Sequence, residues 1–141
     1  MTIASLCKLG DDEFLLCGSH DNLFVHRKQS GEVEVVEVSQ FPFQLGLVDE
    51  VPGEFVSETR LRLGPGDTLF VITDGVTEAA EGGDYKQGLY NEERLVAFIR
   101  ATAGRPVDTI KSALVQELDQ FTRGVYHDDV TFIIARRQEA A

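Results

Sequence analysis

The sequence predicts an α+β fold in which a largely antiparallel sheet is covered by helices. Short apolar segments separated by turn residues fill the first half of the chain, and two segments with helical periodicity follow. One more apolar segment comes after the helices, so two strands that are apolar on both faces lie on either side of a helical pair. This order is typical of a layered domain, and 141 residues suffice for one domain.

The strands of the first half are bounded by glycine, aspartate and asparagine, which favour turns. The segment 68–73 is apolar on both faces, so we expect it to be central in the sheet. Residues 41–46 are expected to form an apolar loop. We predict strands over 3–9, 13–17, 23–25, 32–38, 55–63 and 68–73.

The second half is predicted to contain two helices and a last strand. Asn91 is a good N-cap, and Gly104 would end the first helix. Arg105-Pro106 would open the second helix and Gly124 would close it. The second helix carries a one-sided apolar stripe, interpreted as core, formed by Val107, Ile110, Leu114, Leu118 and Phe121. The last strand, 130–135, is apolar on both faces, so we expect it to be central as well. We expect one domain over 1–137 and a polar tail over 138–141.

Composition excludes some classes of partner. Thirteen lysines and arginines face 24 aspartates and glutamates, so the net charge is -11. This charge argues against binding to nucleic acid or to an anionic membrane. The sequence has neither the apolar run of about 18 residues needed to span a bilayer nor a secretory signal, so we expect a cytoplasmic location. Cys7 and Cys17 are interpreted as buried free thiols.

Three aspartates are expected to converge at one edge of the sheet. Asp74 ends one two-sided strand, and Asp128-Asp129 precede the other. If these strands pair in antiparallel fashion, the carboxylates lie close together, and hard cations such as Mg²⁺ or Mn²⁺ take ligands of this kind. Gly75 would let the backbone turn sharply behind the ligand. The alternative is that Asp74-Gly75 forms an ordinary turn and Asp128-Asp129 caps a strand.

Several motifs, in this order and spacing, resemble the SpoIIE/RsbU-like bacterial branch of the metal-dependent (type 2C) Ser/Thr protein phosphatases. Residues 63–79 (LGPGDTLFVITDGVTEA) resemble the branch's signature. Residues 90–95 (YNEERL) resemble the segment after it, and 127–134 (HDDVTFII) resemble its closing strand. Residues 18–20 (GSH) and 43–46 (FQLG) resemble its Ala-Gly-His turn and its Pro-Leu-Gly loop.

The resemblance implies a largely antiparallel β-sandwich with flanking helices and a two-metal site for Mn²⁺ or Mg²⁺. In such a site the metals activate a water that hydrolyses phosphoserine or phosphothreonine without a phosphoenzyme intermediate. Asp74 and Asp128 match the family's metal ligands. Gly75 and Asp129 are assigned a supporting place, with no ligand role for Asp129. The implied partner is a phosphoprotein, for which the family suggests an anti-sigma-factor antagonist.

The chain departs from the family's pattern at its beginning. The opening Gly-Gly-Asp motif, which in the family supplies the carboxylate that bridges both metals, has no match before the strand at 2–9, and residues 82–85 (GGDY) lie too late in the chain to count. We therefore interpret the sequence as the C-terminal portion of a phosphatase domain that lacks the N-terminal part. Alone it is expected to be weakly active or inactive, and to form a homodimer that covers exposed sheet. The alternative is a non-catalytic, phosphatase-like regulatory module. His20, His26 and His127 are interpreted as turn, solvated and loop residues.

Overall fold

The computed structural model describes residues 3–19, 22–38 and 58–139, which form two antiparallel sheets and a layer of helices. One sheet, in the order β1-β2-β5, consists of β1 (Ile3–Lys8), β2 (Glu13–Ser19) and β5 (Glu58–Arg62). The other, in the order β4-β3-β6-β7, consists of β3 (Leu23–His26), β4 (Val33–Val36), β6 (Thr68–Ile72) and β7 (Phe132–Arg136). The helical segments are α1 (Asp74–Thr77), the 3₁₀ turn η2 (Glu81–Gly83), α2 (Asn91–Thr102) and α3 (Val107–Thr122).

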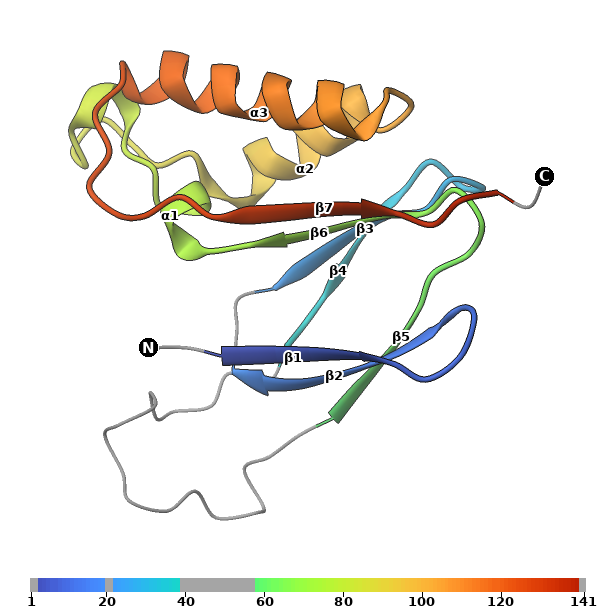
Figure 1. Ribbon diagram of the computed structural model, residues 1–141. Coiled ribbons are helices and arrows are strands. Elements are labelled where there is room, and N and C mark those ends of the chain that lie inside the picture. The colour runs from blue at the N-terminus through green and yellow to red at the C-terminus, as the bar shows by residue number, and fades with distance from the viewer. Residues whose placement is uncertain (1–2, 20–21, 39–57, 140–141) are drawn as a thin grey trace, which may run out of the picture.

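The described elements are arranged in three layers. Helices α2 and α3 lie over one face of the four-stranded sheet, and the three-stranded sheet lies on its other side (Figure 1). Every pair of neighbouring strands is antiparallel. The predicted α+β class, an antiparallel β-sandwich with flanking helices, is therefore confirmed.

Two apolar clusters hold these layers together. Successive side chains of β3 and β6 point to opposite faces of the sheet, so alternate residues of these strands belong to different clusters. Phe24 and Phe70 pack in the cluster with α2 and α3, whereas their neighbours Val25 and Leu69 pack in the cluster between the sheets. All four side chains are at most 3% exposed. A strand that contributes to a core on each face must be apolar throughout, which explains the sequence of β6 and confirms its predicted central place.

The helices begin and end close to where the sequence predicts. The Oδ1 of Asn91 accepts a hydrogen bond from the backbone N–H of Arg94 at 3.0 Å, so Asn91 caps α2 as expected. Helix α3 ends at Thr122, because Arg123 is left-handed (φ 55°) and Gly124 follows with φ 74°. The predicted stripe on α3 is core: Ile110, Leu114 and Leu118 are buried, and Val107 and Phe121 are half-buried.

The prediction for the last strand is wrong in one respect. Strand β7 spans Phe132–Arg136 and forms an edge of the four-stranded sheet, since only β6 pairs with it among the described residues. Phe132 and Ile134 pack against the helical cluster, but Ile133 faces away and is 60% exposed. An apolar side chain on the second face of a strand therefore does not prove that this face is covered.

The expectation for the cysteines is also partly wrong. In the register of β1 and β2, Cys7 lies opposite Leu15 and Cys17 lies opposite Ser5, so the two thiols are free as expected. However, Cys7 is exposed and Cys17 is only half-buried. Within the described residues, β1 lies at the edge of its sheet and neither of its faces is covered, since the side chains from Ser5 to Lys8 are all exposed.

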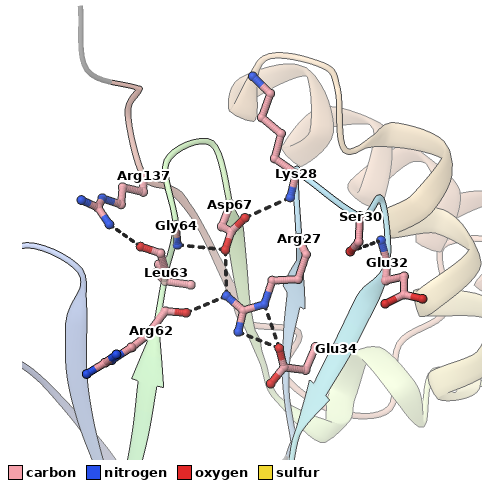
Figure 2. Close-up of polar contacts among 10 residues, drawn as sticks. All are labelled: Arg27, Lys28, Ser30, Glu32, Glu34, Arg62, Leu63, Gly64, Asp67 and Arg137. Carbon is pink, nitrogen blue, oxygen red and sulfur yellow. Dashed lines mark hydrogen bonds and ion pairs between the residues drawn. The ribbon is translucent and has the colours of Figure 1, made fainter.

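A buried carboxylate at the turn into β6 ties the two sheets to each other. The carboxylate of Asp67, whose side chain is 8% exposed, accepts hydrogen bonds from the backbone N–H groups of Gly64 and Lys28 and from the guanidinium of Arg27 (Figure 2). Arg27 also donates to the carbonyl of Arg62 at 2.6 Å. Burial would raise the pKa of Asp67, but these three hydrogen bonds outweigh it and hold the pKa below its usual value.

Some expectations fall on residues that the structure does not describe. These are the apolar loop at 41–46, the FQLG match at 43–46 and the turn at His20. In the described ranges, no helix is both long and apolar enough to cross a membrane.

Candidate metal centre

The ends of the two neighbouring strands bring the predicted aspartates to one edge of the sheet. Strands β6 and β7 are antiparallel, with Ile72 opposite Phe132, so β6 ends where β7 begins. The backbone N–H of Thr73 donates to the carbonyl of Thr131 at 3.0 Å. The Thr73 hydroxyl accepts from the N–H of Thr131 at 3.1 Å and donates to the carbonyl of Asp129 at 3.2 Å. The predicted antiparallel pairing is confirmed; that the carboxylates share a metal ion stays a prediction.

Both predicted ligands are exposed carboxylates anchored by one oxygen each. The Oδ1 of Asp74 accepts a hydrogen bond from the N–H of Gly75 at 2.9 Å, and the Oδ1 of Asp128 accepts one from the N–H of Asp129 at 2.7 Å. Within the described residues, the second oxygen of each carboxylate has no hydrogen-bond partner. Asp74 begins the short helix α1, which the sequence analysis missed because four residues are too few to show periodicity.

Gly75 is required for the close approach of the two segments. A Cβ atom at this position would lie 2.4 Å from the carbonyl oxygen of Asp129 and 3.0 Å from its carbonyl carbon. Gly75 lies within α1 and does not have a positive φ, so the sharp turn expected behind the ligand is not the reason for glycine. Asp129 takes part through its backbone, which packs against Gly75.

An aromatic wall borders Asp128, and sequence reasoning missed it. The ring of Tyr85 stacks on that of His127 at 5.0 Å between centroids, and the Nε2 of His127 lies 2.7 Å from the carbonyl oxygen of Gly83. The 82–85 segment, discounted as a metal motif, therefore packs against the residues just before Asp128. A cleft of about 70 Å³ lies between these parts. It is lined by Gly75, Glu78, Ala79, Ala80, Tyr85, Tyr126, His127 and Asp128.

A match to a model of a protein family identifies the family of this chain. Residues 8–138 match the model of Stage II sporulation protein E (SpoIIE). The chain belongs to the SpoIIE family. No curated protein sequence matches it.

Several solved structures share the fold of this chain. The phosphatase domain of SpoIIE from Bacillus subtilis, presoaked with Mn, superposes with a TM-score of 0.71 at 19% identity, covering 100% of this chain and 58% of that one. The RsbU and RsbW domains of Rv1364c from Mycobacterium tuberculosis give 0.73 at 22% identity, covering 99% and 37%. The SiaA-PP2C domain of Pseudomonas aeruginosa gives 0.70 at 21%, covering 89% and 47%. This SpoIIE-family chain thus spans about half, or less, of these relatives.

The residues present fit part of a divalent-ion site. Asp74 and Asp128 offer hard oxygen ligands at one edge of the sheet, which suit Mg²⁺ or Mn²⁺. Across the described parts of this SpoIIE-family chain, however, no group of three histidines, cysteines or acidic residues could hold a metal ion. The two aspartates can therefore supply a share of the ligands that a two-metal centre requires.

Proposed function

We propose that this chain contributes Asp74 and Asp128 as metal ligands to a protein serine/threonine phosphatase domain. The reaction is hydrolysis of phosphoserine or phosphothreonine on a bacterial regulatory protein, for which the family resemblance suggests an anti-sigma-factor antagonist. Membership of the SpoIIE family supports phosphatase chemistry in general terms. The observation that carries the assignment is the pairing of β6 with β7, which brings the family's two matched aspartates to one edge.

The residues of this chain would hold and orient the reacting groups. When bound, Mn²⁺ or Mg²⁺ supplies an activated water and neutralises phosphate charge. The N–H groups of Gly75 and Asp129 fix one oxygen of each aspartate, and the other oxygen would bind the metal. The stacked rings of Tyr85 and His127 offer a flat surface beside Asp128, against which residues flanking the phosphorylated side chain would pack.

The chain alone should bind metal weakly and turn over substrate slowly. Two metals need a carboxylate that bridges them, and none is found with Asp74 and Asp128 among the described residues. The same observation favours a second candidate, in which the chain is a non-catalytic, phosphatase-like module that binds a regulatory partner. Metal binding tests the site itself, and hydrolysis distinguishes the two candidates, because only a phosphatase turns over substrate.

A titration of Mn²⁺, followed by the loss of the free-ion electron paramagnetic resonance signal, tests the proposal. Asp74→Asn and Asp128→Asn should each weaken binding about tenfold or more, since each removes a charged ligand. Asp108→Asn is the matched control, because this side chain is 95% exposed and lies at the start of α3. Equal Mn²⁺ affinity in all four proteins would contradict the proposed site.

Hydrolysis of a chromogenic phosphate ester in Mn²⁺ is the second measurement. We expect low activity for the chain alone. Strong Mn²⁺-dependent activity that Asp74→Asn abolishes would support the phosphatase assignment but would show that the bridging carboxylate lies elsewhere in this chain. Mn²⁺ binding without any hydrolysis, even after supply of the rest of a phosphatase domain, would favour the non-catalytic module.

A further inference from the structure

A groove lies at the opposite end of strands β6 and β7 from the candidate metal centre. Thr68 and Arg136 pair at this end, whereas Ile72 and Phe132 pair at the other. The groove has a volume of about 600 Å³ and runs between the sheet and the α2–α3 connection. The residues that line it include His26, Lys28, Val107, Ile134, Arg136 and Arg137.

The charge of this groove is opposite to that of the chain. Among the described residues that line it are three of the 13 lysines and arginines, namely Lys28, Arg136 and Arg137, and one carboxylate, Glu139. The chain as a whole carries 24 acidic residues and a net charge of -11. A concentration of positive charge on an acidic protein attracts anions to that place in particular.

The arginines are held in place by the fold. Arg136 donates from Nε to the Thr68 hydroxyl at 2.8 Å and from Nη1 and Nη2 to the carbonyls of Arg105 and Ala103 at 2.9 and 2.5 Å. Arg137 donates to the carbonyl of Leu63 at 2.6 Å. A guanidinium has five N–H donors, so both arginines keep donors beyond those used within the described residues. Because they are already ordered, less conformational entropy is lost when a ligand binds.

A carboxylate of the chain itself already lies in the groove. Glu139, in the polar segment after β7, forms an ion pair with the ammonium group of Lys28. Both side chains are 56% exposed, and exposed ion pairs of this kind are weak. The groove therefore accepts a glutamate side chain on a peptide segment, and a ligand that binds more tightly can displace it.

Two apolar side chains, Val107 and Ile134, also line the groove, and both are half-buried. We propose that the groove binds an acidic peptide segment of a partner protein, with carboxylates on Lys28 and Arg137 and an apolar side chain against the two apolar residues. Glu139 occupies the place of one of those carboxylates when the partner is absent. The proposal stands apart from the phosphatase assignment, since none of these residues belongs to the candidate metal centre.

His26 supplies a readout that does not depend on activity. Burial and the nearby charge of Arg136 lower the pKa of His26, and these effects outweigh Asp67, which raises it. A peptide carboxylate bound in the groove adds negative charge near the ring, so it should raise the pKa of His26 in a nuclear magnetic resonance titration.

The test is fluorescence anisotropy with a labelled synthetic peptide of alternating glutamate and leucine. Lys28→Gln and Arg137→Gln should each weaken binding about tenfold, because each removes a charge-assisted contact. Glu139→Gln should tighten binding, because it removes the competing carboxylate. Lys8→Gln is the matched control, since Lys8 is an exposed lysine of the other sheet and should bind as the wild type does.

Three results would overturn the proposal. Equal peptide affinity in the wild type and Lys28→Gln, whose exposed side chain can be changed without loss of folding, would overturn the proposal. So would a Glu139→Gln variant that binds no more tightly. If inorganic pyrophosphate raises the pKa of His26 and the peptide does not, the groove binds phosphate and the peptide assignment is wrong.

Discussion

The substitution Gly75→Ala tests how closely the two aspartate-bearing segments must approach each other. The added Cβ would lie 2.4 Å from the carbonyl oxygen of Asp129, whereas ordinary contacts begin at 3.4 Å. The difference, 3.4 - 2.4, means that the two backbones must separate by about 1.0 Å. That separation stretches the four hydrogen bonds that join Thr73 to the backbone of Asp129 and Thr131.

The expected loss of stability in Gly75→Ala follows from two opposing effects. Overpacking of this kind costs about 1–3 kcal/mol, and weakened hydrogen bonds add a further fraction of about 1 kcal/mol each. Alanine is favoured over glycine in a helix by about 1 kcal/mol, which offsets part of the loss in α1. We therefore expect a net loss of about 1–2 kcal/mol, or a decrease in Tm of about 3–8 °C for a chain of this size.

Thermal unfolding and the Mn²⁺ titration are both measured on Gly75→Ala and on a matched Gly10→Ala control. A Cβ at Gly10 meets nothing within 4 Å, and its φ is not positive, so this variant should be unchanged or stabilised by up to about 1 kcal/mol. Gly75→Ala should also bind Mn²⁺ more weakly, because it moves Asp128 away from Asp74. If Gly75→Ala is as stable as Gly10→Ala, the two segments are not packed as described and the reasoning fails.

Two further predictions concern the sheets. The pKa of Asp67 is below its unfolded value near 3.8, so its stabilising effect is present above pH ~4 and is lost as the pH falls through the folded pKa. Asp67→Asn should therefore cost about 1–3 kcal/mol in urea unfolding at pH 7 and less at pH 3. The exposed Asp108→Asn, which removes only an acid from the first turn of α3, should cost less than about 1 kcal/mol at pH 7. We also expect a homodimer by light scattering at micromolar concentration, through the β7 edge and Ile133. Ile133→Lys should give a monomer, and a monomeric wild type would contradict this interface.

The sequence predicts the elements with long or two-sided patterns and misses those that depend on neighbours. The stripe along α3 and the apolar run of β6 each carry enough residues to determine both the element and its burial. The edge position of β7 could not be read from its residues, because Phe132 and Ile134 face a covered side while the equally apolar Ile133 does not. A strand's own sequence records its side chains but not whether another strand lies beside it.

Some features of the candidate site could likewise be predicted from the sequence, and others could not. The positions of Asp74 and Asp128 at the ends of paired strands could be predicted, since that requires only two strands and their relative direction. The packing of Tyr85 on His127 joins loops 42 residues apart (127 - 85), and no local pattern indicates it. The basic groove is still harder to predict from the sequence, because Lys28 and Arg136 are brought to one groove only by the strand order β3-β6-β7.

The two ends of β6 are far enough apart to act separately. Thr68 and Ile72 are four residues apart, which is about 13 Å along a strand, and the candidate ligand Asp74 lies beyond Ile72. At that separation a divalent ion and a carboxylate in water interact by about 0.6 kcal/mol, and physiological salt, with a screening length of about 8 Å, reduces this further. A divalent ion at Asp74 and a peptide carboxylate at Lys28 should thus bind with nearly additive free energies. Failure of the metal centre in Asp74→Asn would therefore leave the groove's affinity for the acidic peptide unchanged, and the two proposals can be refuted one at a time.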